Sequence, residues 1–193
     1  MRSSELDFEE LLSAWNKDTL FLAGRNVTRV SLNQKIRKLK GFESPEPIVG
    51  DRVICLRNNW EKHIFNGQLG TVDELGPGPI ESKDPEEGEE RKKHWYKAAI
   101  SLYGESTFRG LISRHQFHAP KTLTEVQGLR QSEMGDLFDF GYALTVHKAQ
   151  GSQAKRAVVF EERMTREEDL WRRWLYTAVT RAESELLIVG QGS

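Results

Sequence analysis

A cluster of polar side chains follows an apolar run in segment 141–153. The run 138–146 predicts a buried strand, and five residues with ligand-binding potential stand at its end: Thr145, His147, Lys148, Gln150 and Gly151. Open α/β sheets bind their ligands outside the carboxyl ends of strands. A single histidine is most often a surface or structural residue. It is therefore the whole cluster that predicts a ligand site.

Segment 167–182 predicts a helix that carries one arginine beside its packed face. With about 100° between successive residues, one face carries an apolar stripe: Trp171, Leu175, Ala178 and Ala182. The strip next to it holds Trp174, Thr177 and Arg181. Arg181 has an ordinary explanation as a solvated cation that the helix dipole favours in the last turn. The alternative is a guanidinium held in a fixed place for a ligand.

Together, segments 141–153 and 171–182 resemble motifs V and VI of superfamily 1 helicases, in the RecD/Dda-like branch. The motif VI likeness lies in Tyr-Thr-Ala-Val-Thr-Arg-Ala, which ends at Ala182. It implies that Arg181 contacts the γ-phosphate of ATP from the opposite domain, as a charge-stabilising arginine finger.

The resemblance also divides the polar cluster between two ligands. It implies contacts to the backbone of single-stranded DNA from Thr145, His147 and Lys148. It implies that the nucleotide is faced by Gln150, Gly151, Gln153 and Tyr176. Gln153 stands where many relatives carry a glutamate that binds the ribose, so this position departs from the family pattern.

The strand and helix in segment 21–37 resemble the motif IV region of the same branch, with Asn33 and Arg37 as the matching residues. The resemblance implies that Arg37 is a second phosphate ligand. The segment also has a purely structural explanation, because Asn26 is suited to cap a helix that follows a buried strand at 19–24. For Arg37 both interpretations stay open.

Segment 50–72 resembles the Src-homology-3-like barrel inserted in RecD/Dda-type helicases, which grips the translocating strand or supports a neighbouring pin. In its loop, Trp60 could stack on a base while Lys62 or His63 meets a phosphate. Alternatively, Trp60 covers the end of the barrel. Further candidates for nucleic-acid contact are Arg109, Arg114 and His115.

The elements that position these residues predict one α/β domain interrupted by a β-rich insertion. We expect a RecA-like parallel sheet with helices on both faces from residues 1–47 and 119–193. Short strand-like runs and the Asn66-Gly67 turn predict a small antiparallel barrel over 48–118. The charged segment 76–93 within it reads as a solvated, mobile hairpin loop.

Composition limits the possible functions. The chain of 193 residues has 28 Lys and Arg against 29 Asp and Glu, so any DNA contact must be local. The only cysteine, Cys55, lies in a strand-like run and excludes an intrachain disulfide or a cysteine-rich metal site. No apolar run approaches the roughly 18 residues of a membrane span, and the start has no signal-peptide core. We therefore expect a cytoplasmic protein without a metal site of its own.

The sequence lacks a glycine-rich phosphate loop ending in Lys and Ser or Thr. We therefore expect the C-terminal motor domain of an ATP-dependent DNA helicase, inactive alone, of the kind used in DNA repair and recombination. ATP and Mg would be shared with a first RecA-like domain, in cis or in trans. One alternative is a non-catalytic module that binds DNA or a protein. Another is a barrel that recognises a peptide.

Overall fold

The computed structural model describes residues 3–77, 94–104, 106–126, 129, 133–163 and 165–190, with the backbone alone for 3–7. The chain forms two compact units. One comprises Met1–Glu43 and Tyr142–Ser193, and the other comprises Ser44–Gly141. The second unit thus contains the predicted insertion, 48–118, together with the stretch that follows it up to Gly141.

A four-stranded parallel sheet forms the centre of the first unit, in the order β7-β1-β8-β9. Its strands are β1 (Thr19–Ala23), β7 (Ala143–Thr145), β8 (Ala154–Phe160) and β9 (Ala182–Val189). Every residue of β1 is buried, as expected of a central parallel strand covered on both faces. The edge strand β9 instead exposes apolar side chains: Leu186, Leu187 and Ile188.

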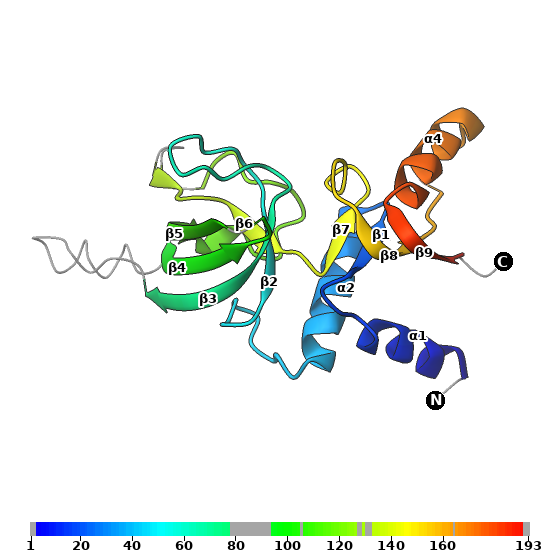
Figure 1. Ribbon diagram of the computed structural model, residues 1–193, viewed down its shortest axis with the longest axis horizontal. Coiled ribbons are helices and arrows are strands. Elements are labelled where there is room, and N and C mark those ends of the chain that lie inside the picture. The colour runs from blue at the N-terminus through cyan, green and yellow to red at the C-terminus, as the bar shows by residue number, and fades with distance from the viewer. Residues whose placement is uncertain are drawn as a thin grey trace, which may run out of the picture. The chain divides into compact units, whose positions relative to one another are not determined.

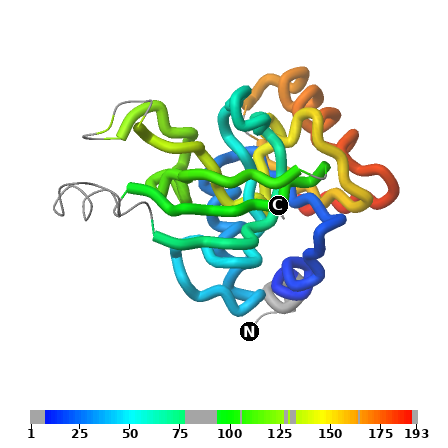
Figure 2. The backbone as a smooth tube through the Cα atoms, turned by 60° about the vertical axis from the view of Figure 1, so that its left-hand side comes forward, coloured from blue at the N-terminus to red at the C-terminus, as the bar shows by residue number. Residues whose placement is uncertain are grey.

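In the described part of the chain, three helices flank this sheet: α1 (Ser3–Ser13), α2 (Asn26–Leu39) and α4 (Glu168–Val179). Figures 1 and 2 show α1 and α2 on one side of the sheet and α4 on the other. The predicted helix 167–182 ends earlier than expected, because the chain turns at Thr180 into β9. Among the described residues, no helix is long and apolar enough to cross a membrane.

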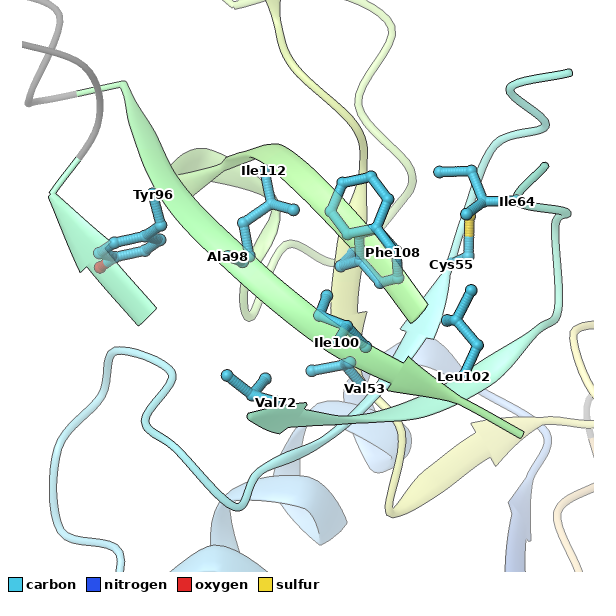
Figure 3. Close-up of a cluster of buried hydrophobic side chains, with 11 residues drawn as sticks. Val53, Cys55, Ile64, Val72, Tyr96, Ala98, Ile100, Leu102, Phe108 and Ile112 are labelled. Carbon is cyan, nitrogen blue, oxygen red and sulfur yellow. The ribbon is translucent and has the colours of Figure 1, made fainter. Parts of the chain in front are cut away.

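The second unit contains a five-stranded antiparallel sheet in the order β5-β4-β3-β2-β6. Its strands are β2 (Arg52–Cys55), β3 (Leu69–Pro77), β4 (Trp95–Leu102), β5 (Ser106–Ser113) and β6 (Phe138–Phe140), and a short 3-10 helix, η1 (Arg114–Gln116), follows β5. Buried side chains from these strands, including Val53, Ile100 and Phe108, form one apolar cluster (Figure 3). Cys55 is fully buried in it, which confirms its predicted place in the core. The two sheets together confirm the predicted fold class.

The run 138–146 is two strands in two sheets, and the prediction of a single strand is wrong. β6 pairs antiparallel with β2, whereas β7 pairs parallel with β1. Both halves are buried, so apolar character alone could not reveal the break. Gly141 lies between them, and a Cβ atom there would come within 2.9 Å of the Val53 carbonyl carbon.

The predicted loop 76–93 is described only at its start. Gly76 and Pro77 extend β3 and pair with β4, so the strand is longer than the sequence indicated. The remainder of that prediction, 78–93, lies outside the described residues.

Candidate functional site

The predicted DNA-contact cluster forms a tight turn after β7. The carbonyl oxygen of Thr145 accepts hydrogen bonds from the backbone N–H groups of Lys148 and Ala149, at 2.9 and 3.0 Å. Gly151 closes the turn with φ +91°, which a residue with a side chain adopts only with strain. The turn leaves His147 and Gln150 exposed, while Thr145 is only 6% exposed.

A pocket of about 480 Å³ opens beside this turn. It lies beyond the ends of β7 and β8 and is bordered by α4, which is where open α/β sheets bind ligands. The lining residues come from these three segments and the loop before α4: Val146, His147, Gln150, Glu162, Thr165, Leu170, Trp171, Arg173, Trp174 and Thr177.

Glu162 is a buried carboxylate on the pocket wall that the sequence reasoning missed. One oxygen accepts the backbone N–H groups of Gly24 and Arg25 at 2.7 and 2.8 Å, and the other accepts the Thr28 hydroxyl at 2.5 Å. The carboxylate therefore holds the start of α2, where the helix dipole favours negative charge. The sequence feature that could have indicated this carboxylate is an acidic residue just after the buried strand β8.

This contact replaces the cap that the sequence predicted for α2. The residue preceding the first helical turn is Arg25 and not Asn26, and Arg25 makes no side-chain capping bond. The Asn26 side chain instead accepts a hydrogen bond from Arg29 Nε at 3.2 Å. Glu162 comes from a distant part of the chain, so a local capping pattern could not reveal it.

Arg181 lies outside this pocket, near the amino ends of β8 and β9. Its guanidinium donates to the carbonyl oxygens of Thr177 and Ser152, at 3.0 and 3.3 Å, and to the Thr180 hydroxyl at 3.1 Å. Its own carbonyl oxygen accepts the Ala154 N–H. The contact with Ser152 brings the arginine of the second predicted motif directly onto the end of the first motif segment, 141–153.

The remaining nucleotide-contact candidates are in different surroundings. Gln153 is exposed just before β8, and Tyr176 is 70% exposed on α4. Arg37, in contrast, is buried within the first unit, at 2% exposure. A guanidinium in that position favours the structural interpretation of Arg37, and its role as a phosphate ligand stays a prediction.

Asn33, the other residue of the motif IV likeness, is a buried structural amide. Its side-chain oxygen accepts the N–H groups of Tyr142 and Ala143, both at 3.0 Å. Its side-chain nitrogen donates to the carbonyl oxygens of Arg29 and Ala143. Asn33 thus fixes the start of β7, and with it the turn that follows, against α2.

In the second unit, Trp60 is 71% exposed and makes an edge-to-face contact with Phe65, with 5.2 Å between ring centroids. It therefore does not cover the end of the sheet core, and most of its side chain is accessible to a base. Lys62 forms a salt bridge with the buried carboxylate of Asp136. That carboxylate also accepts from Asn59 at 2.9 Å, so the loop that displays Trp60 is held by side-chain bonds.

The other basic candidates of this unit are engaged with neighbours. Arg109 pairs with Glu74, and Arg114 pairs with Glu46 and stacks on the Tyr96 ring. Burial and the hydrogen bond to Glu46 raise the pKa of Tyr96 to about 12.

His115 is also engaged, because its Nε2 lies 2.9 Å from Nδ1 of His94. Burial and the nearby charges of His94 and Arg114 lower the pKa of His115. Among the described residues, no group of three or more potential metal ligands comes together.

Comparisons with known proteins give the fold a context. Residues 140–189 match the model of the UvrD-like helicase C-terminal domain. No curated protein sequence matches the chain.

The solved structures similar to this chain include Pif1 helicases. Pif1 helicase from Bacteroides bound to single-stranded DNA has a TM-score of 0.55 and 16% identity, over 97% of this chain and 45% of that one. The same helicase with ADP-AlF3 and single-stranded DNA has a TM-score of 0.54 and 16% identity, over 97% and 45% of the two chains. Pif1 helicase from Candida albicans has a TM-score of 0.51 and 15% identity, over 100% of this chain and 50% of that one.

The chain thus spans about half the length of these helicases. At this level of identity the likeness shows a shared fold. The segment that carries the predicted turn and Arg181 falls within the matched helicase C-terminal domain. The chain has the fold of a helicase C-terminal domain.

Proposed function

We propose that the chain is the C-terminal motor domain of an ATP-dependent DNA helicase of superfamily 1, in the RecD/Dda-like branch. In this proposal, the unit of residues 1–43 and 142–193 is the RecA-like domain, and the unit 44–141 is its Src-homology-3-like insertion, which extends beyond the 48–118 expected from the sequence. Arg181 is the arginine finger, and the turn after β7 is part of the track for single-stranded DNA. ATP and Mg are held between this domain and a first RecA-like domain.

The observation that carries the proposal is the hydrogen bond from Arg181 to the Ser152 carbonyl oxygen. It joins the arginine beyond α4 to the turn that holds His147 and Gln150. A change at one of the two groups would therefore be felt by the other, as coupling between ATP and DNA requires. The exposed ring of Trp60 supports a second DNA contact through base stacking.

In the complete enzyme, binding of ATP between the two domains would draw them together, and hydrolysis would let them part. Arg181 would sense the γ-phosphate only in the closed state, so it would connect the chemistry to movement along DNA. The first domain would supply the lysine and the Mg ligands that bind the β- and γ-phosphates.

Two measurements on the purified chain test the proposal. We expect ATP hydrolysis at the background rate with or without DNA, because no phosphate loop is present in the sequence. We expect weak binding to a fluorescein-labelled oligothymidine, with an affinity that falls steeply as salt rises, since phosphate contacts dominate such binding. Robust DNA-stimulated turnover would overturn the assignment of a half-site.

The titration also separates the proposal from its alternatives. Tight binding that persists at high salt would identify a non-catalytic DNA-binding module. An absence of DNA binding at low salt would point to a module that binds a protein or peptide.

A further inference from the structure

The pocket beside the turn has walls suited to a flat ring. Trp171 and Trp174 contribute indoles from α4, and Leu170 and Val146 add aliphatic surface. Trp174 is 8% exposed and so has a fixed position, while Trp171 is half-buried. Pockets with aromatic and aliphatic walls and a few polar groups are typical of sites for small, partly apolar ligands.

The charge distribution argues against a phosphate inside the pocket. Glu162 lies on the wall, and its carboxylate is already fixed by Gly24, Arg25 and Thr28. A phosphate group placed inside would meet this fixed negative charge at short range. His147 and Arg173 also line the pocket and are exposed, so they offer donors to a phosphate at its mouth.

We propose that this pocket receives a single unstacked base of single-stranded DNA, while the adjoining phosphate lies beside His147 and Arg173. The inference rests on the proposed function, in which the turn after β7 contacts the DNA backbone. The volume of about 480 Å³ lies within the range of small-ligand sites and leaves room for a base with its sugar. The pocket thus makes part of the affinity depend on the base, in addition to the phosphate contacts.

The test compares two oligonucleotides of equal length on the purified chain. One is oligothymidine, and the other has the same backbone with every base removed. We expect oligothymidine to bind about tenfold more tightly, which is the scale of stacking one base on aromatic side chains. Both should bind more weakly as salt rises, because they share the phosphate contacts.

Two variants locate the source of this preference. Trp171→Leu removes one indole, and Leu170→Trp fills the pocket from a residue that is already half exposed and so should not disturb folding. We expect each to reduce the preference to the part that stacking on Trp60 contributes, while leaving the affinity for the abasic oligonucleotide unchanged. Leu187→Trp, at an exposed position on β9 outside the pocket, is the matched control and should keep the preference.

The possible failures are distinguishable. If neither oligonucleotide binds at low salt, the proposed function fails. If both bind equally, or if Trp171→Leu and Leu170→Trp keep the preference, the pocket does not hold a base. A preference that only Trp60→Ala removes would assign base stacking to the second unit and would also overturn the inference.

Discussion

The carboxyl and amino ends of the parallel sheet present their functional side chains in opposite ways. Beyond β7 and β8, His147 and Gln150 are exposed around an open pocket. Beside the amino ends of β8 and β9, Arg181 donates to three oxygen atoms of its own chain. The first region is ready to receive a ligand without rearrangement. In the second region, the Arg181 guanidinium is bound to the protein, and a ligand must compete with these three oxygen atoms for it.

This difference fits the two parts of the proposed function. A DNA track must be available in every step of translocation, so a preformed, open site suits it. An arginine finger acts only when a second domain brings the γ-phosphate close. A guanidinium has more donors than the three bonds of Arg181 use, so it can reach a phosphate while it keeps part of its present contacts.

The largest effect is expected from Arg181→Ala, in a protein that also contains the first RecA-like domain. ATP turnover should fall by about 10³-fold or more, the scale lost with a finger arginine, while DNA affinity stays close to wild type. Arg181→Lys should not restore turnover, because a point charge cannot reproduce the planar fork of a guanidinium. Steady-state ATP hydrolysis and an oligothymidine titration provide the two readouts. Wild-type turnover in Arg181→Ala would refute the motif VI assignment.

The sequence allowed the elements of this comparison to be predicted, but not their arrangement. Thr145 stands at a strand end as expected, since an apolar run followed by polar residues is a local pattern. Arg181 was expected on the helix and lies just beyond it, because helix ends depend on the chain that follows. The three acceptors of Arg181, and its position away from the pocket, depend on tertiary contacts that no local sequence pattern encodes.

Two long-range contacts could not be predicted for the same reason. Glu162 accepts the N–H groups of Gly24 and Arg25, and Asn33, predicted only as part of the motif IV likeness, accepts those of Tyr142 and Ala143. Sequence spacing indicates neighbours on one helix or strand, whereas these bonds join segments more than a hundred residues apart. Residues whose function is to position others are therefore the hardest to predict from sequence.

An intermediate effect is expected from Glu162→Ala, which tests whether the open region is preorganised. The change leaves the N–H groups of Gly24 and Arg25 without their acceptor, and each unsatisfied donor costs about 1–3 kcal/mol. We expect the free energy of unfolding to fall by about 3 kcal/mol in a urea titration. Amide hydrogen exchange at the start of α2 should also become faster.

The neighbouring carboxylate offers a matched control for this prediction. Glu161→Ala removes the same charge from the next residue, which is only half-buried and is not on the pocket wall. We expect its free energy of unfolding to stay within about 0.5 kcal/mol of wild type. Equal destabilisation by both variants would show that lost charge, and not the contact with α2, is responsible.

The smallest effects are expected from two substitutions in the open region, His147→Ala and Thr145→Ala. His147 is exposed at the pocket, whereas Thr145 is 6% exposed, although both were predicted to contact the DNA backbone. We expect His147→Ala to lower oligothymidine affinity about tenfold, as for one hydrogen bond to a charged group, and Thr145→Ala about threefold, as for a weaker neutral donor. In a protein with the first domain, both should keep basal ATP turnover near wild type, the reverse of Arg181→Ala. A larger loss of DNA affinity in Thr145→Ala than in His147→Ala would mean that the DNA lies deeper in the turn than the exposed side chains indicate, and the open region would then have to rearrange on binding.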